Sequence, residues 1–245
     1  EKLKIDDKSR VKVAQDEDCK KNLNFILDNK PLYDNAEKQM REDIKACPYE
    51  MTFVGQTAIM MRFNDEYDKI KGKIPCNNRV ETFLYHGSKI ENHYGIINSS
   101  LYNPNTDSQK GIKITDKGYY GKGTYATENI FYACYYANKL NFLKPGEKCS
   151  VILCKTIYNK SSVCEKTKLD LGSEVSSKIS SNYGINHALV GNECKFFPIK
   201  QTETGKHRVV AQEFIFPHKH QVLPLFSFTI MRRDYCMIWK DENIN

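Results

Sequence analysis

The stretch GYYGKGTYATENIFYACYYANKL at residues 118–140 leads from a glycine cluster into a short apolar run and then into a helical pattern. Gly121 lies before the predicted strand GTYAT (residues 123–127), and Gly123 is its first residue. A dinucleotide fingerprint instead has the order G-x-G-x-x-G and lies between a strand and a helix. The glycines therefore do not match a dinucleotide-binding turn. They do not match a P-loop either, because Lys122 is followed by glycine where that motif has serine or threonine. The glycines therefore predict a flexible approach to a strand that presents Tyr125.

The residues after this strand form one face of a predicted helix. Ala133, Tyr136, Ala137 and Leu140 follow the i, i+3, i+4, i+7 spacing of a single helical face. We expect Ala137 and Leu140 to pack in the core. If Tyr125 and Tyr136 converge, their rings can form a slot for a flat heterocycle, at about 1 kcal/mol for each stacked face beyond burial.

Two further strands carry polar residues in unusual places. LYHGSKIENHYGIINSSL (residues 84–101) has His86 at the end of a strand and Gly87 directly after it, so that a ligand could approach the bare backbone. VVAQEFIFPHKHQV (residues 209–222) places Glu213 among apolar strand residues. A carboxylate in such a place is either a paired structural residue or a functional one. Each feature alone is more often structural than catalytic.

Together, the order and approximate spacing of LYHGS, GKGTYAT with a following helix that ends in YYA, QEFIF and HQVLPLF are specific. The chain resembles the catalytic domain of the poly(ADP-ribose) polymerase family, a diphtheria-toxin-like ADP-ribosyltransferase with a His-Tyr-Glu triad. The resemblance extends over about residues 50 to 240. It implies an ADP-ribosyltransferase fold of the α+β class, with two mostly antiparallel β-sheets around an NAD+ cleft. HGSKIENHYGII and GKGTYAT look most like the mono-ADP-ribosylating branches.

The resemblance also implies roles for individual residues. The triad would be His86, which orients NAD+, together with Tyr125 and Glu213. The main chain of Gly87 would hold the nicotinamide carboxamide, and the rings of Tyr125 and Tyr136 would sandwich the nicotinamide. The full set of NAD+-binding residues that it implies is His86, Gly87, Ser88, Asn92, Tyr120, Tyr125, Ala133 and Tyr136, with Ser88 and Asn92 along the adenosine side. The segment at 107–120 would line the NAD+ site, and the segment at 197–209 would face the protein acceptor.

The chemistry of this reaction gives the carboxylate a reason to be there. Release of nicotinamide leaves positive charge on the ribose, as in an oxocarbenium-like transition state of glycoside hydrolysis. A carboxylate near the ribose 2′-hydroxyl stabilises that charge most in the transition state, and Glu213 could also orient or deprotonate an incoming hydroxyl. One position departs from the family, because Ala133 stands where a serine often bonds the nicotinamide amide. We expect the missing hydroxyl to weaken the binding of nicotinamide-like groups by about 1 kcal/mol.

Composition places the chain among ordinary globular proteins. Its 245 residues suffice for one domain with an appendage or for two small ones. No apolar run approaches the roughly 18 residues of a membrane span, and the opening EKLKIDDKSR has no apolar region typical of a secretory signal. The formal charge of +7 is spread among interleaved acidic residues, which favours a solvated surface over an anionic partner.

The nine cysteines are irregularly spaced and contain no C-x-x-C pair, so a zinc ribbon or finger is not expected and no metal site is predicted. His218 and His220 are expected to be surface histidines. The cysteines are typical of reduced thiols in an intracellular protein, many of them small core residues. Both a cytoplasmic and a nuclear location agree with this composition.

The predicted secondary structure changes at about residue 80, from mainly helical to mainly short strands. Residues 1–80 are predicted to be a helical N-terminal segment packed on a catalytic domain at 81–245. The helical candidates in the N-terminal segment are 19–30, which ends before Pro31, 34–47 and 64–74. The stretch 51–63 is ambiguous between strand and helix. After residue 80, short strands outnumber helices without alternating with them, which favours an α+β domain with mainly antiparallel pairing.

The predicted activity is a pentosyl-transferring glycosyltransferase: an NAD+-dependent protein ADP-ribosyltransferase with NAD+ as co-substrate. Transfer of single units is slightly favoured, and chain elongation to poly(ADP-ribose) stays open. The acceptor would be a protein, and the chain itself could serve. A silent module that binds NAD+ or ADP-ribose is the alternative of another class. A nucleic-acid-binding module would need a clustered basic stripe that the chain lacks, so nucleic acid is not expected to be required.

Overall fold

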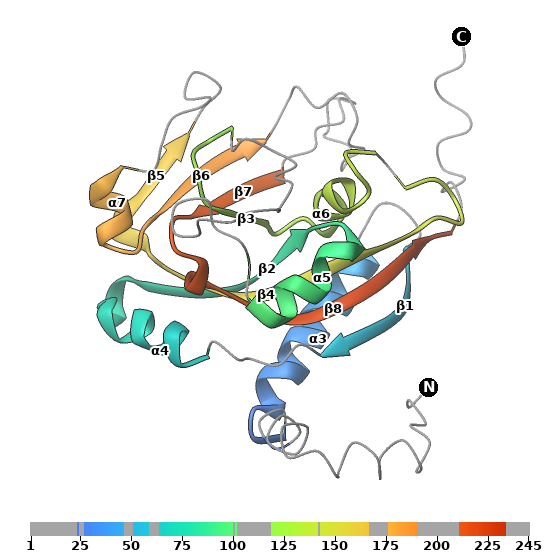
Figure 1. Ribbon diagram of the computed structural model, residues 1–245, viewed down its shortest axis with the longest axis horizontal. Coiled ribbons are helices and arrows are strands. Elements are labelled where there is room, and N and C mark those ends of the chain that lie inside the picture. The colour runs from blue at the N-terminus through green and yellow to red at the C-terminus, as the bar shows by residue number, and fades with distance from the viewer. Residues whose placement is uncertain are drawn as a thin grey trace.

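A computed structural model describes residue 24 and residues 27–46, 51–58, 64–99, 101, 119–141, 143–166, 176–190 and 211–233. Within these ranges the strands form one eight-stranded sheet in the order β1-β8-β4-β2-β3-β7-β6-β5 (Figure 1). The strands are β1 (Met51–Ala58), β2 (Arg79–Gly87), β3 (Thr124–Thr127), β4 (Lys148–Asn159), β5 (Val163–Lys166), β6 (Ile185–Val190), β7 (Ala211–Phe216) and β8 (Val222–Arg232). The helices are α3 (Lys30–Ala46), α4 (Asn64–Lys73), α5 (Ile90–Ser99), α6 (Ile130–Ala137) and α7 (Ser177–Ser181). Short 3-10 turns are η1 (Cys76–Asn78), η2 (Lys160–Ser162) and η4 (Lys219–Gln221).

The sheet corrects one part of the predicted fold. Two separate sheets were expected, but the described strands form a single sheet whose halves join at β2 and β3. That junction consists of one residue pair, Tyr85 with Thr127, whereas β2 and β4 pair along the whole of β2. The junction is narrow on the β2 side alone, since all four residues of β3 pair with β7. The expected α+β class and mainly antiparallel pairing are confirmed, with β5 and β6 as the parallel pair.

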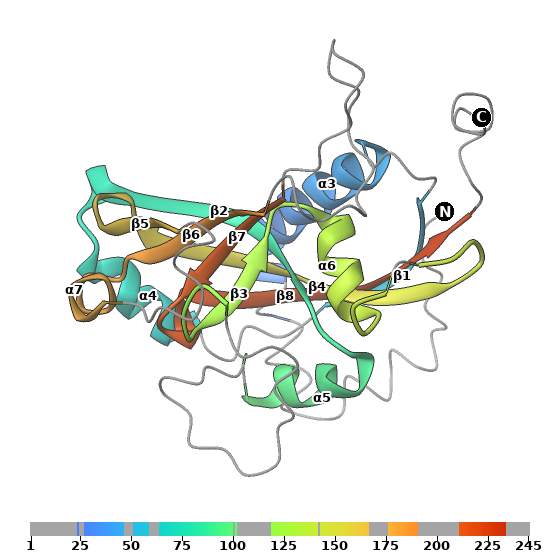
Figure 2. The ribbon, with the colours of Figure 1, turned by 90° about the horizontal axis from the view of Figure 1, so that it is seen from above.

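The sheet is covered on both faces. Figure 2 shows α3 on one side of the sheet and α5 on the other. Successive residues of a strand point to opposite faces, and β4 divides in this way. Leu153 packs in the core cluster that contains Met40 of α3, and Ile152 packs in the cluster that contains Ile96 of α5. Helix α6 lies on the α3 side, where Ala133 and Cys134 join the same cluster.

The N-terminal part differs from the predicted helical segment. Pro31 was expected to end a helix, but it is the second residue of α3. Proline suits the first turn because the amide hydrogen that it lacks has no acceptor within the helix there. The ambiguous stretch at 51–63 contains strand β1, which pairs with β8 at the edge of the sheet. Most of the helical candidate at 19–30 lies outside the described residues, and the domain boundary at residue 80 stays a prediction.

Most elements after residue 60 agree with the local sequence pattern. Strands were expected up to His86, at 123–127 and around Glu213, and these correspond to β2, β3 and β7. Leu140 is a correction, because it was expected in the core and is 41% exposed. Helix α6 ends at Ala137, and the positive φ angles of Lys139 (56°) and Leu140 (61°) turn the chain away from the helical face.

Several smaller expectations concern the surface and the thiols. His218 and His220 are both half-buried, and the carbonyl oxygen of Ser180 lies 2.8 Å from His218 Nε2. The cysteines that the structure describes are free thiols: Cys76, Cys134, Cys149, Cys154 and Cys164. Among the described residues no group of three or more acidic, histidine or cysteine side chains is arranged to hold a metal ion. Within the same part of the chain, every helix is too short or too polar to cross a bilayer.

Candidate active site

The glycine cluster forms a tight turn that the hydroxyl of Tyr125 closes. This hydroxyl donates to the carbonyl oxygen of Gly121 at 2.8 Å and accepts from the amide of Tyr120 at 3.0 Å. Gly121 has a φ of 114°, which L side chains rarely adopt. At Gly123 an added Cβ would lie 2.6 Å from the carbonyl oxygen of Phe216, so glycine lets β3 approach β7. These glycines thus serve backbone geometry, and the first glycine of the cluster lies outside the described residues.

His86 is tied to the same strand through its ring. Its Nδ1 lies 2.7 Å from the carbonyl oxygen of Tyr125. A carbonyl only accepts hydrogen bonds, so Nδ1 carries the proton and Nε2 of the neutral ring is an acceptor. Burial lowers the pKa of His86, outweighing the opposite effect of the Tyr125 hydrogen bond. At neutral pH the ring therefore offers a lone pair that can accept from a hydroxyl group.

A second histidine, which the sequence reasoning missed, fixes the turn after Gly87. His93 is 4% exposed, and its Nε2 donates to the carbonyl oxygen of Ser88 at 3.1 Å. Its Nδ1 accepts from the hydroxyl of Ser227 at 2.8 Å, and the amide of Asn92 donates to Ser88 Oγ at 3.1 Å. The available signal was its spacing, because residue 93 lies three positions before Ile96 on one face of α5. Ser88 and Asn92 are thus held together at the end of β2.

His86, which is half-buried, and His93, which is buried, predict that stability falls on mild acidification. Burial is the largest cause lowering the pKa of both His86 and His93. The unfolded chain takes up these protons near pH ~6.5, before the folded chain does, so the free energy of unfolding decreases as the pH drops below that value. We expect a lower melting temperature at pH 5.5 than at pH 7.5. The decrease should be smaller in His93→Gln, and an equal decrease in that variant would contradict the assignment.

Gly87 allows α6 to pack directly on the end of β2. An added Cβ would lie 2.0 Å from the carbonyl oxygen of Ala133 and 2.9 Å from Cβ of Tyr136. The close approach brings Tyr136 to the strand end that carries His86. Ala133 itself is 1% exposed and packs in the core cluster on the α3 side. The predicted effect of its missing hydroxyl stays a prediction.

Glu213 is buried in the sheet and accepts hydrogen bonds from two tyrosines of α6. It is 5% exposed and pairs with Thr127 of β3, so β7 places it beside the strand of Tyr125. Its Oε1 accepts from the hydroxyl of Tyr132 at 2.5 Å and from that of Tyr136 at 3.3 Å. The two tyrosine rings meet edge to face, with centroids 5.1 Å apart. Tyr132 was missed by the sequence reasoning, although it precedes Tyr136 by four residues and so lies on the same helical face.

The structure brings the predicted triad and ring pair into one region. His86 contacts the backbone of Tyr125, and β3 pairs with β7 at Glu213. Glu213 contacts Tyr136, whose Cβ lies against Gly87 at the end of β2. The remaining predicted residues flank this ring of contacts: Ser88, Asn92, Tyr120 and Ala133. Of the two predicted loops, residues 107–118 and 197–209 lie outside the described residues.

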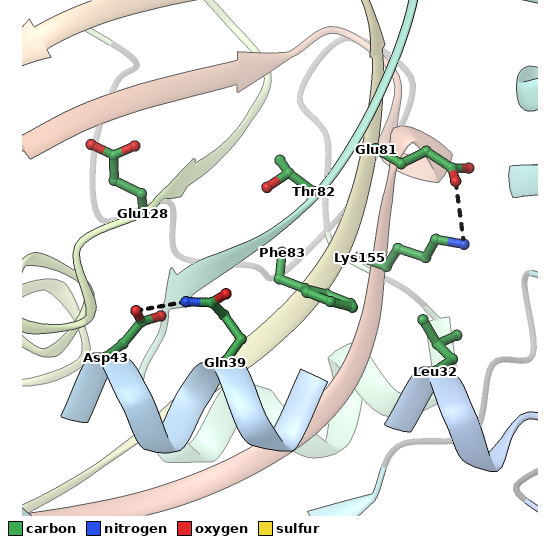
Figure 3. A pocket seen from close by; sticks show the side chains of 8 residues that line it. All are labelled: Leu32, Gln39, Asp43, Glu81, Thr82, Phe83, Glu128 and Lys155. Atoms are coloured by element: carbon green, nitrogen blue, oxygen red, sulfur yellow. Dashed lines mark hydrogen bonds and ion pairs between the residues drawn. The ribbon is translucent and has the colours of Figure 1, made fainter. Parts of the chain in front are cut away.

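A separate cavity of about 540 Å³ lies between α3 and β2 (Figure 3). Its lining contains none of the predicted site residues and consists of Leu32, Gln39, Asp43, Glu81, Thr82, Phe83, Glu128 and Lys155. Three of these are carboxylates, and the single ammonium group, on Lys155, lies 3.8 Å from Glu81. The negative lining would repel a pyrophosphate. This cavity is therefore a poor site for a dinucleotide.

The α+β sheet thus places a half-buried histidine, two edge-to-face tyrosines and a buried glutamate around β2, β3 and β7. The family model of the poly(ADP-ribose) polymerase catalytic domain matches residues 33–230, and the chain belongs to this family. Membership supports an ADP-ribosyltransferase fold, and in general an NAD+-dependent ADP-ribosyltransferase activity with NAD+ as its substrate. A comparison with curated proteins finds no significant match.

Proposed function

We propose that the chain releases nicotinamide from NAD+ and transfers a single ADP-ribose unit to a protein acceptor. The observation that carries the proposal is the buried carboxylate of Glu213, which accepts a hydrogen bond from Tyr136. Strand β7, which carries Glu213, pairs with β3, and the backbone of β3 holds the ring of His86. The carboxylate of Glu213 is 5% exposed, and carboxylates are rarely buried to this extent unless they are paired or functional. Stabilisation of positive charge in a transition state is such a function.

The proposed step breaks one bond and forms one. The bond between the nicotinamide nitrogen and the ribose C1′ breaks, and its electron pair leaves with neutral nicotinamide. Positive charge develops on the ribose, where the carboxylate of Glu213 stabilises it more in the transition state than in the ground state. The oxygen of the acceptor then bonds to C1′, and its proton passes through Glu213 to solvent.

The other site residues would bind and orient NAD+. His86 Nε2 would accept a hydrogen bond from a ribose hydroxyl, since Nδ1 is committed to the carbonyl of Tyr125. The hydroxyl of Tyr125 is hydrogen-bonded within the glycine turn, and its ring would stack on the nicotinamide opposite Tyr136. Main-chain groups at Gly87 would meet the carboxamide. Ser88, Asn92 and Tyr120 would lie toward the adenosine and the adjoining loop.

Single-unit transfer rests on the likeness of HGSKIENHYGII and GKGTYAT to the mono-ADP-ribosylating branches. Synthesis of poly(ADP-ribose) is the second candidate, because the triad glutamate that accompanies elongation in the family is present at position 213. The protein acceptor, which could be the chain itself, and an intracellular location are part of the proposal.

Incubation with NAD+ labelled on its adenylate phosphate tests the proposal. We expect release of free nicotinamide and a sharp labelled band of the protein on a denaturing gel. A ladder or smear would replace single-unit transfer by chain elongation. A protein that binds NAD+ but yields neither nicotinamide nor label would overturn the proposal and indicate a silent binding module.

A further inference from the structure

We propose that Tyr132 is a positioning residue that holds the carboxylate of Glu213 for the transfer step. This inference rests on the proposed function and adds a residue that the triad does not contain. Tyr132 is 5% exposed, and its hydroxyl donates to Glu213 Oε1 at 2.5 Å. The two residues are 81 positions apart in the chain, so the contact joins α6 to β7 across the site.

The helix that carries Tyr132 is held in place at its first turn and where it packs on β2. The side chain of Asn129 accepts hydrogen bonds from the amides of Phe131 and Tyr132, each at 3.0 Å, and so caps the first turn of α6. The helix then packs on Gly87, where only a hydrogen atom fits. These contacts fix the main chain at Tyr132, while burial of its ring and a 3.2 Å contact between its hydroxyl and that of Tyr136 restrict the phenol oxygen.

The chemistry of the pair suits a donor that keeps its proton. Burial raises the pKa of Tyr132, and the charge of Glu213 raises it further. The hydroxyl therefore stays protonated and donates a charge-assisted hydrogen bond, which stabilises the ionised form of the carboxylate. A carboxylate must be ionised and correctly oriented to stabilise positive charge on the ribose. Tyr132 would contribute to both conditions without touching NAD+.

Tyr132 and Tyr136 would have different tasks, although both contact Glu213. The side chain of Tyr136 is half-buried, and its hydroxyl lies 3.3 Å from Oε1 and 3.2 Å from the hydroxyl of Tyr132, so it is the more exposed of the two tyrosines. The ring of Tyr132 is enclosed and its bond is shorter. Loss of the Tyr132 hydroxyl should thus slow the chemical step and leave NAD+ affinity unchanged.

Tyr132→Phe tests this separation, because it removes one oxygen and retains the buried ring. We expect kcat for nicotinamide release to fall ~10-fold, while KM for NAD+ stays within about twofold. Tyr183→Phe is the matched control, since it removes a phenol oxygen whose bond to Lys73 Nζ (3.2 Å) is exposed. Its kcat should equal that of the wild type. A Tyr132→Phe protein with wild-type kcat would overturn the inference.

A double-mutant cycle with Glu213→Gln separates positioning from a merely structural role. If Tyr132 acts through Glu213, Tyr132→Phe should lower kcat by less than about twofold in the Glu213→Gln background. An undiminished second decrease would overturn the inference while leaving the proposed function intact. A wild-type protein that releases no nicotinamide would instead overturn the proposed function.

Incorporation of 3,5-difluorotyrosine at position 132 covers the case in which Tyr132→Phe does not fold. This residue keeps the hydroxyl and the ring but makes the phenol a stronger acid. Because the hydrogen bond to Glu213 changes without being removed, we expect kcat to change at least ~3-fold with KM for NAD+ unaltered. A kcat equal to that of the wild type would contradict the assignment.

Discussion

Glu213→Gln is expected to slow ADP-ribose transfer at least ~100-fold while NAD+ affinity stays within about twofold. Glutamine has nearly the same shape as glutamate and can still accept from the hydroxyl of Tyr132, so the packing of this buried residue should survive. What the substitution removes is the negative charge, which matters most when positive charge develops on the ribose. The loss should therefore appear in kcat and not in binding.

The measurement is single-turnover release of nicotinamide together with calorimetric titration of NAD+. Glu165→Gln is the matched control, because its carboxylate lies in the same half of the sheet, on β5, and pairs with His187 at 2.9 Å. That variant should retain wild-type turnover. Unchanged turnover in Glu213→Gln would remove Glu213 from the mechanism.

The second large effect is expected from Gly87→Ala, which should lower the free energy of unfolding by about 1–3 kcal/mol or more. The added Cβ would lie 2.0 Å from the backbone oxygen of Ala133, and backbone cannot rotate away as a flexible side chain can. Helix α6 must then move off the end of β2. Since α6 carries Tyr136 to the site, NAD+ affinity should fall together with stability.

Urea denaturation with an unchanged m-value would measure the loss of stability, and calorimetric titration would measure NAD+ binding. Gly95→Ala supplies the matched control, because a Cβ at that position of α5 meets no atom within 4 Å. Alanine in a helix interior is more favourable than glycine by about 0.5–1 kcal/mol, so this variant should be slightly more stable than the wild type. Equal stability of Gly87→Ala and wild type would show that β2 and α6 can separate at no cost.

Local sequence patterns were sufficient for the elements that carry the site. The apolar run before His86 predicted β2, and the apolar residues around Glu213 predicted β7. The spacing of Ala133, Tyr136 and Ala137 predicted a helix after the strand GTYAT, and the structure has α6 there, beginning at Ile130 with Asn129 as its cap. These signals are local, because hydrogen-bond periodicity and capping involve residues within about one turn or one strand of each other.

Elements whose formation depends on distant partners were not found in this way. Strands β5 (VCEK) and β6 (INHALV) have little apolar alternation, and they are stabilised by parallel pairing with each other and by β7. The single Tyr85–Thr127 pair that joins the two halves of the sheet is likewise a matter of register between strands. The end of α6 at Ala137 is followed by two residues with positive φ angles, Lys139 and Leu140, which no apolar spacing predicts.

The order and identity of His86, Gly87, Tyr125 and Glu213 are properties of the amino-acid sequence, and together with their neighbouring residues they were enough to suggest the family. Only the tertiary structure decided that Tyr132 meets Glu213, that Tyr125 orients the ring of His86, and that Gly87 admits α6. The physical reason is distance along the chain. Residue types and short spacings determine which elements form, whereas strand register and backbone packing determine which side chains from those elements meet.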